Sequence, residues 1–121
     1  MEKRAELLEN SLLAIWNERN VEKRLEEMKK TYAPDIKFFE FDPDEPIVGH
    51  QAISDLITKL QSEWPLNMVF ALNKPSRVNH DVQVASWNLG PSGDASFATG
   101  IDVAIIENGL MKAFYLYFDP K

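Results

Sequence analysis

Apolar residues recur along the first third of the chain with the spacing of an amphipathic helix. Ala5, Leu8, Leu12 and Ile15 follow one another at intervals of three and four residues, and Trp16 borders the stripe that they form. The pattern predicts a helix that packs this stripe on the core.

A second helix is predicted to begin after Asn20, because asparagine side chains cap helix N-termini. Its apolar positions are Val21, Leu25 and Met28. The charged residues among them, in the run EKRLEEMKK, are interpreted as the solvent-exposed side of this helix.

The period changes at Pro34, which ends the helical region. A strand is predicted around Ile36 and Phe38, and the acidic sequence DPDEP after it indicates a loop. A third helix is expected between Gly49 and Pro65. Its apolar stripe consists of Ile53, Leu56, Ile57 and Leu60.

Strand patterns fill the chain from Asn67 onward. Four strands are predicted, NMVFALNK, SRVNHDVQVASWNLG, ASFATGIDVAIIE and LMKAFYLYFD, with turns at PSGD and ENG. Helices followed by an antiparallel meander indicate an α+β domain. Because no linker or repeat interrupts the pattern, residues 1–121 are expected to form a single domain.

The charge and the amino-acid composition exclude several classes of binding partner and cofactor. The 121 residues carry a formal net charge of −6, which argues against nucleic acid and against an anionic membrane surface. There is no cysteine, and the two histidines lie far apart, so neither a metal nor another cofactor is expected. A charged N-terminus and the lack of a bilayer-spanning apolar run predict a cytoplasmic protein.

Asp102 stands at the centre of an otherwise apolar strand, where a carboxyl group is costly unless it is paired or neutralised. Alternation along the strand gives it small neighbours, which leave space for a pocket. These are Ala98, Gly100 and Ala104, whereas the opposite face is bulky, with Phe97, Thr99, Ile101, Val103 and Ile105. Two interpretations stay open: Asp102 lines a pocket, or it forms a structural pair with Arg77 or His80.

The two histidines also have two interpretations each. His80 is a candidate general base or ligand-binding residue, or a structural histidine at the beginning of a strand. His50 follows Gly49 at the beginning of the third helix, where it contacts a ligand or caps the helix.

Three segments in this order, YAPDI, GHQAI and GIDVAIIENGLM, resemble the nuclear transport factor 2-like superfamily. The resemblance covers nearly the whole chain, is closest to the SnoaL-like group and extends to ketosteroid isomerases. It implies a cystatin-like cone, in which a curved antiparallel sheet wraps around the N-terminal helices and encloses an apolar pocket. It also implies a homodimer through the outer face of the sheet, which would cover the bulky face that contains Phe97, Ile101 and Val103.

The resemblance to ketosteroid isomerases assigns provisional roles to single residues. Glu40 matches the position of the general-base carboxylate, and Asp102 matches the aspartate that hydrogen-bonds the oxyanion. Trp16 stands where these isomerases have a tyrosine. Since an indole donates one hydrogen bond but is not a phenolic acid, steroid isomerisation itself is not expected.

Other relatives suggest further positions. SnoaL-type cyclases have an aromatic residue followed four residues later by an acid/base aspartate, and Tyr115 and Asp119 have that spacing. Limonene epoxide hydrolases use an Asp-Arg-Asp site, for which Arg77 with Asp102 is the one available combination. The ligand-binding candidates are therefore Trp16, His50, His80, Trp87, Tyr115 and Asp119.

Three functions are consistent with these features. The first is a cofactor-independent isomerase, cyclase or lyase, in which Glu40 and Asp102 share one apolar pocket, have raised pKa values and transfer protons to and from a small apolar molecule. The second is a non-catalytic module that binds such a molecule. The third is a dimerisation domain whose cone is filled by Trp16, Trp64 and Trp87.

Overall fold

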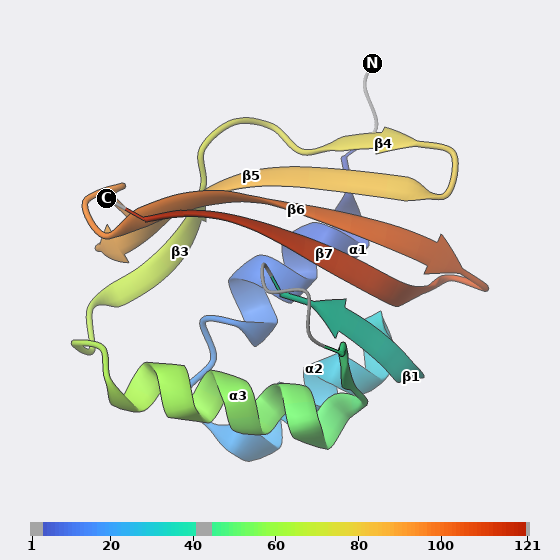
Figure 1. The fold of residues 1–121 in the computed structure, drawn as a ribbon, viewed down its shortest axis with the longest axis horizontal. Coiled ribbons are helices and arrows are strands. Elements are labelled where there is room, and N and C mark those ends of the chain that lie inside the picture. Colours follow the sequence, from blue (N-terminus) through green and yellow to red (C-terminus); the bar gives the residue numbers. More distant parts are fainter. Residues whose placement is uncertain (1–3, 41–44, 121) are drawn as a thin grey trace.

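The helices lie on one side of a curved, open sheet (Figure 1). The structure is a computed structural model that describes residues 4–40 and 45–120. Its helical segments are α1 (Glu6–Asn10), the π-helical η1 (Ser11–Ile15), α2 (Val21–Thr31) and α3 (His50–Ser62). Its strands are β1 (Tyr32–Phe39), β2 (Ile47–Val48), β3 (Met68–Leu72), β4 (Arg77–Asn79), β5 (Val82–Pro91), β6 (Ala98–Glu107) and β7 (Leu110–Pro120).

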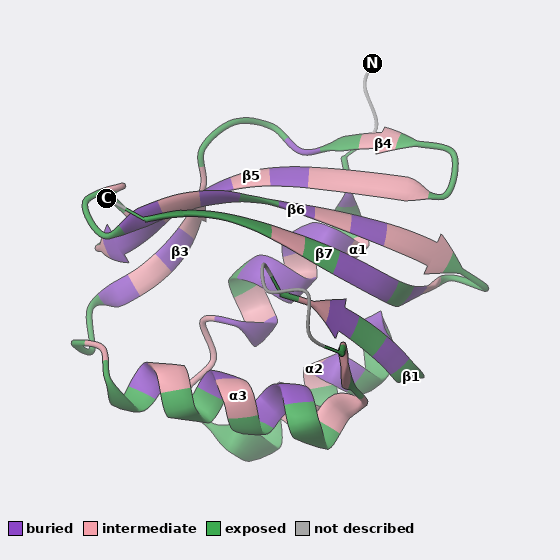
Figure 2. Ribbon diagram, in the orientation of Figure 1, coloured by how far each residue is buried: buried purple, intermediate pink, exposed green. Residues whose placement is uncertain are grey.

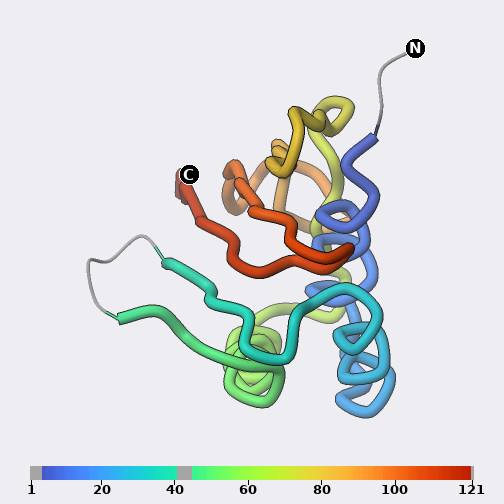
Figure 3. The backbone as a smooth tube through the Cα atoms, turned by 90° about the vertical axis from the view of Figure 1, so that its right-hand side faces the viewer, coloured from blue at the N-terminus to red at the C-terminus, as the bar shows by residue number. Residues whose placement is uncertain are grey.

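The strands of the described residues form one mixed sheet in the order β2-β1-β7-β6-β5-β3, and β4 pairs with β5 beside this path. The expected α+β class is confirmed, but the sheet is not wholly antiparallel. β1 runs parallel to β7, next to it in space and far from it in sequence (Figure 3). No hairpin turn joins these two strands, so the alternation pattern contained no information about their relative direction.

Two of the expected turns are confirmed. Asn108 and Gly109 join β6 to β7 with φ angles of 54° and 78°, and Ser92 and Gly93 lie in the β5–β6 connection with φ angles of 55° and 83°. The prediction of one long strand from Ser76 to Gly90 is wrong. That segment contains two strands, β4 and the greater part of β5. They pair with each other and are joined by the turn around His80.

The first helical stripe is buried as predicted. Ala5, Leu8, Leu12 and Ile15 are at most 2% exposed. The helix widens in its second half, where the N–H of Trp16 donates to the carbonyl of Ser11 five residues earlier, at 3.0 Å. Figure 2 shows the buried residues gathered where the helices meet the inner face of the sheet.

Asn20 caps α2 as predicted, accepting a hydrogen bond from the Lys23 N–H at 3.0 Å. The interpretation of EKRLEEMKK as a solvated face is wrong for Arg24, which is fully buried between α2 and α3. Its Nη1 donates to the Thr58 hydroxyl at 2.8 Å, and its Nη2 donates to the Gln61 side chain at 2.7 Å. Further acceptors are the Ser54 carbonyl and hydroxyl and the Glu18 carbonyl.

The neutral acceptors around Arg24 explain how a buried cation is tolerated. A guanidinium has five N–H donors in a fixed fork, and here they are met by oxygens of α3 and by the Glu18 carbonyl, which precedes α2. Desolvation lowers the pKa of Arg24 from its usual value. The helix pair therefore depends on hydrogen-bond geometry around one charge and not on apolar contact alone.

We expect Arg24→Lys to lower the free energy of unfolding by roughly 3 kcal/mol, because an ammonium has three donors and leaves buried acceptors without partners. Urea unfolding measures this change. Lys29→Ala on the exposed side of α2 is the matched control and should change stability by less than about 0.5 kcal/mol. Equal stabilities of the two variants would contradict the role assigned to Arg24.

No helix within the described ranges is long and apolar enough to cross a bilayer.

Candidate functional site

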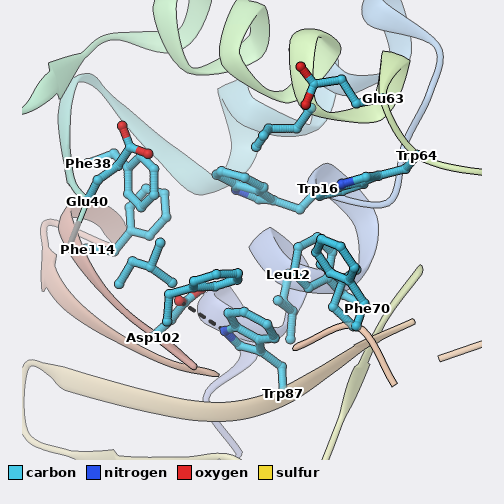
Figure 4. Close-up of a pocket in the computed structure, with 15 residues that line it drawn as sticks. Leu12, Trp16, Phe38, Glu40, Glu63, Trp64, Phe70, Trp87, Asp102 and Phe114 are labelled. Atoms are coloured by element: carbon cyan, nitrogen blue, oxygen red, sulfur yellow. Dashed lines mark hydrogen bonds between the residues drawn. The ribbon is translucent and has the colours of Figure 1, made fainter. Parts of the chain in front are cut away.

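A cavity of about 300 Å³ lies between the inner face of the sheet and the helices (Figure 4). Its wall is mostly apolar. The apolar side chains are Leu12, Trp16, Phe38, Leu60, Trp64, Phe70, Trp87, Leu89, Phe97, Phe114, Leu116 and Phe118, and the polar ones are Glu40, Glu63 and Asp102. All three tryptophans line this space without filling it, which contradicts the third of the three alternatives, a cone packed solid by them.

Aromatic rings follow one another around the wall. Phe70 meets Trp87 edge-on with ring centroids 5.1 Å apart, and it meets Trp64 at 6.0 Å. Trp16 continues the series against Phe38, at 5.4 Å. Such edge-to-face contacts favour defined positions of the rings relative to one another. The cavity wall is therefore built of ordered, polarisable aromatic side chains.

Asp102 is the buried carboxyl group of this wall, with an exposure of 7%. The Trp87 indole N–H donates to its Oδ1 at 3.1 Å, whereas Oδ2 has no hydrogen-bond partner among the described residues. Burial raises the pKa of Asp102 to about 7, and the bond from Trp87 opposes this rise only in part. The side chain can therefore gain or lose a proton near neutral pH.

Gly100 makes the contact between Trp87 and Asp102 possible. Gly100 and Trp87 are paired across β5 and β6, and Asp102 lies two residues further along β6. A Cβ atom at Gly100 would be 2.2 Å from the Trp87 ring, which is too close for any side chain. The indole therefore lies over the glycine backbone and reaches Asp102 diagonally.

A second buried hydrogen-bonded group lies near Asp102. The Tyr32 hydroxyl is 2.6 Å from the Ser11 hydroxyl and accepts a bond of 3.2 Å from the Trp16 indole N–H. Burial raises the pKa of Tyr32, and the nearby charge of Asp102 adds to that rise. Since Tyr32 occupies the single donor of Trp16, this indole offers a ligand its ring and no hydrogen bond.

The two candidate carboxylates border the same cavity but differ in environment. Asp102 is buried, whereas Glu40 follows β1 and is exposed at the edge of the cavity. The expectation that both carboxylates would be buried is therefore wrong for Glu40. Figure 4 shows Asp102 beside Trp87, on the sheet side, and Glu63 on the side of α3.

The two histidines lie away from this cavity. His50 Nε2 is 3.1 Å from the Tyr32 carbonyl and 3.0 Å from the Ala33 carbonyl, so it joins the beginning of α3 to β1. His80 is exposed in the β4–β5 turn with a φ angle of 52°. The structure thus places neither histidine on the wall of this cavity with Asp102.

Tyr115 and Asp119 are on the opposite face of the sheet. They pair with Val103 and Thr99 of β6, out of phase with Asp102, and Tyr115 stacks on Phe39 at 4.6 Å. The cyclase-like spacing therefore does not bring an acid/base aspartate to the cavity. The physical reason is the strand period of two, which turns alternate side chains away from each other.

Arg77 does not form the expected site with Asp102 either. It is exposed on β4, where it pairs with Val84, while Asp102 pairs with Ala85. The partner of Asp102 is Trp87 and not Arg77 or His80. The expectation that Phe97 belongs to the bulky outer face of the sheet is wrong. Phe97 precedes β6 and lines the cavity.

Several lining residues had no clear signal in the sequence. Phe70, Phe118 and Glu63 reach the cavity only because β3, β7 and the end of α3 meet around it. Tyr32, which lies near Asp102 but does not line the cavity, is marked in the sequence only as the first residue of the YAPDI segment. No group of three or more potential metal ligands occurs within residues 4–40 and 45–120.

No protein-family model and no curated protein sequence matches the chain. Solved structures match it closely in three dimensions. A protein from Agrobacterium tumefaciens C58, assigned as an isomerase of the SnoaL-like family, superposes with a TM-score of 0.82 at 24% identity, covering 96% of this chain and 97% of its own. The chain has the SnoaL-like fold.

Two further structures extend the comparison. A protein from Jannaschia sp. CCS1, assigned as a SnoaL-like polyketide cyclase, has a TM-score of 0.74 at 13% identity and covers 94% of this chain and 83% of its own. A protein from Catenulispora acidiphila with a ketosteroid isomerase-like fold, solved with trimethylamine, has a TM-score of 0.74 at 12% identity, with coverages of 97% and 88%. The three superpositions establish the fold of this chain. At such low sequence identity they assign no activity, so the function is argued from the residues of the site.

The raised pKa of Asp102 makes the stability of this chain depend on pH. Between the ordinary aspartate value of 3.8 and about 7, the folded chain holds a proton that the unfolded chain has released. The free energy of unfolding therefore falls as pH rises through this window. We expect Asp102→Asn to be more stable than the wild type above pH 7, by roughly 4 kcal/mol, and to match it near pH 4.

Urea unfolding at a series of pH values measures this difference. Asp81→Asn changes an exposed aspartate in the β4–β5 turn and should retain the slope of the wild type. If Asp102→Asn also retains that slope, Asp102 does not hold the proton.

Proposed function

We propose that the protein binds a small apolar molecule in this cavity and that Asp102 transfers a proton during its conversion. One observation carries the proposal: a carboxyl group that is 7% exposed, with one oxygen bonded to Trp87 and the other without a protein partner, lines an aromatic cavity. A volume of about 300 Å³ suits a small organic molecule. The titration of Asp102 near pH 7 suits general acid–base catalysis.

The reaction class is a cofactor-independent isomerisation, cyclisation or elimination. In an isomerisation, ionised Asp102 takes a proton from carbon next to a carbonyl, and the C–H electron pair moves into the enolate. Protonated Asp102 then returns the proton to another carbon, so the atoms balance without an oxidant or reductant. Glu40, at the edge of the cavity, is the second carboxylate available for proton exchange with water.

The alternative is a non-catalytic module that binds an apolar molecule in the same cavity. The exposure of Glu40 favours it, because only one of the two candidate carboxylates, Asp102, is buried on the wall of the cavity. Turnover separates the two functions, since both predict binding.

Cyclohex-3-enone is a suitable probe, because its conversion to cyclohex-2-enone is a proton shift that creates a conjugated absorbance. We expect the wild type to accelerate this conversion, with a rate that rises through about pH 7 as Asp102 ionises. Asp102→Asn should reduce the acceleration roughly 10²–10⁴-fold, and the Asp81→Asn control should retain it.

The same samples distinguish the alternatives. A rate that survives Asp102→Asn would contradict the role of Asp102. Probe binding by the wild type without conversion would favour the non-catalytic module.

We also propose that the outer face of the sheet forms a homodimer. Ile101, Tyr115 and Tyr117 are 42%, 37% and 61% exposed, and pairing places them on this face together with Val103. A contiguous apolar surface of this kind is typical of a protein interface.

The double variant Ile101→Glu/Tyr117→Glu tests this interface. It should convert a dimer into a monomer in size-exclusion chromatography with light scattering, because charges would face each other across the contact. Leu66→Glu is the control, because Leu66 is 82% exposed in the segment between α3 and β3, away from the outer face. A wild type that is monomeric would overturn the proposal.

A further inference from the structure

We propose that the small, mainly apolar molecule bound in this cavity carries one cationic ammonium group, which lies beside Asp102 while the apolar body lies against the aromatic rings. The proposal rests on the small-molecule site proposed above and adds the chemical class of its ligand. It follows from the charges of the wall, the free oxygen of Asp102 and the nature of the surrounding rings.

The charges of the wall all have one sign. The ionisable side chains that line the cavity are Asp102, Glu40 and Glu63, and no lysine, arginine or histidine of the described residues lines it. Arg77 is exposed on β4, and the buried Arg24 is engaged by oxygens of the α2–α3 interface. An ionised Asp102 is therefore a buried anion without a counter-ion from the protein, and a bound cation would supply one.

Asp102 is also oriented to accept a ligand. Its Oδ1 accepts from Trp87, and its Oδ2 is the acceptor that has no partner among the described residues. Asp102 is only 7% exposed, and no fully buried side-chain oxygen of the described residues lacks a partner, so Oδ2 is accessible to a molecule in the cavity. A charge-assisted contact in such an environment is stronger than the same contact at the surface.

The rings around Asp102 favour the same charge. The Trp87 ring centroid lies 6.3 Å from that of Phe118 and 5.1 Å from that of Phe70. The faces of aromatic rings attract cations through their quadrupoles, and tryptophan does so best. These rings therefore attract an ammonium group. An aliphatic wall would remove the group from water without attracting its charge.

Other ligand charges fit less well. An anion would face three carboxyl groups and no compensating donor charge in the described wall. A neutral molecule would gain from burial of apolar surface but would leave the ionised form of Asp102 uncompensated. The wall thus discriminates by charge as well as by shape.

Cation binding should be coupled to the protonation of Asp102. Among the titratable groups, Tyr32 of β1 lies near Asp102, and Glu40 after β1 and Glu63 after α3 line the same cavity. Burial raises the pKa of Asp102 to about 7, and a bound cation would lower it again. Affinity for a permanent cation should therefore rise as the pH rises through that value.

Two probes of equal size separate charge from shape. Benzyltrimethylammonium carries a permanent positive charge, and 2-methyl-1-phenylpropan-2-ol is neutral with the same number of non-hydrogen atoms. Binding is followed by intrinsic fluorescence, because all three tryptophans of the chain line the cavity, and by calorimetry. At about pH 8 we expect the cation to bind roughly tenfold or more tightly than the alcohol.

The variant Asp102→Asn removes the charge and keeps the shape. It should reduce the preference for the cation roughly fivefold or more and leave the alcohol within about twofold of its wild-type affinity. It should also abolish the rise in cation affinity between about pH 5 and about pH 8. The control Asp81→Asn should retain both properties, and circular dichroism verifies that each variant is folded.

The outcomes separate this inference from the proposed function. If the alcohol binds as tightly as the cation in the wild type, the charge class is overturned and the small-molecule site stands. If the cation preference survives Asp102→Asn, the placement of the ammonium group beside Asp102 is overturned. If neither probe binds at millimolar concentration, both this inference and the small-molecule site fail.

Discussion

The site depends on one contact, the hydrogen bond from the Trp87 indole to Asp102 across the backbone of Gly100. It fixes the largest ring of the inner sheet face and gives a buried carboxyl group one partner instead of two. A second donor or a cationic partner would lower the pKa of Asp102 towards its ordinary value. With this single partner, Asp102 keeps a proton near neutral pH and keeps one oxygen free on the cavity wall.

The helices keep the space in front of Asp102 open. Arg24 holds α2 and α3 together through oxygens of both the backbone and side chains, and Gln61 extends this network to the carbonyl of Trp16. Leu60 and Trp64, on and just after α3, therefore form a wall opposite the sheet at a fixed distance. A buried cation far from the ligand thus contributes to the shape of an acidic cavity.

The two faces of β6 and β7 serve different purposes because of strand alternation. The inner face carries Asp102 and the small residues that leave room beside it, and the outer face carries Ile101 and Tyr117. The proposed ligand site and the proposed interface are therefore built from alternate residues of the same strands. This explains why residues close in sequence, such as Asp102 and Val103, contribute to different surfaces.

The sequence alone determined the apolar helix stripe from Ala5 to Ile15, the cap at Asn20, the glycine turn at Gly109 and the unusual position of Asp102 in an apolar strand. These features depend on neighbours within a few residues, so local spacing contains them. Tertiary structure decided what local spacing cannot encode. It buried Arg24 by bringing α3 against α2, ran β1 parallel to β7, broke the long strand at His80, and chose Trp87 instead of Arg77 as the partner of Asp102. Each of these outcomes depends on residues that are distant in the chain and meet only in the folded protein.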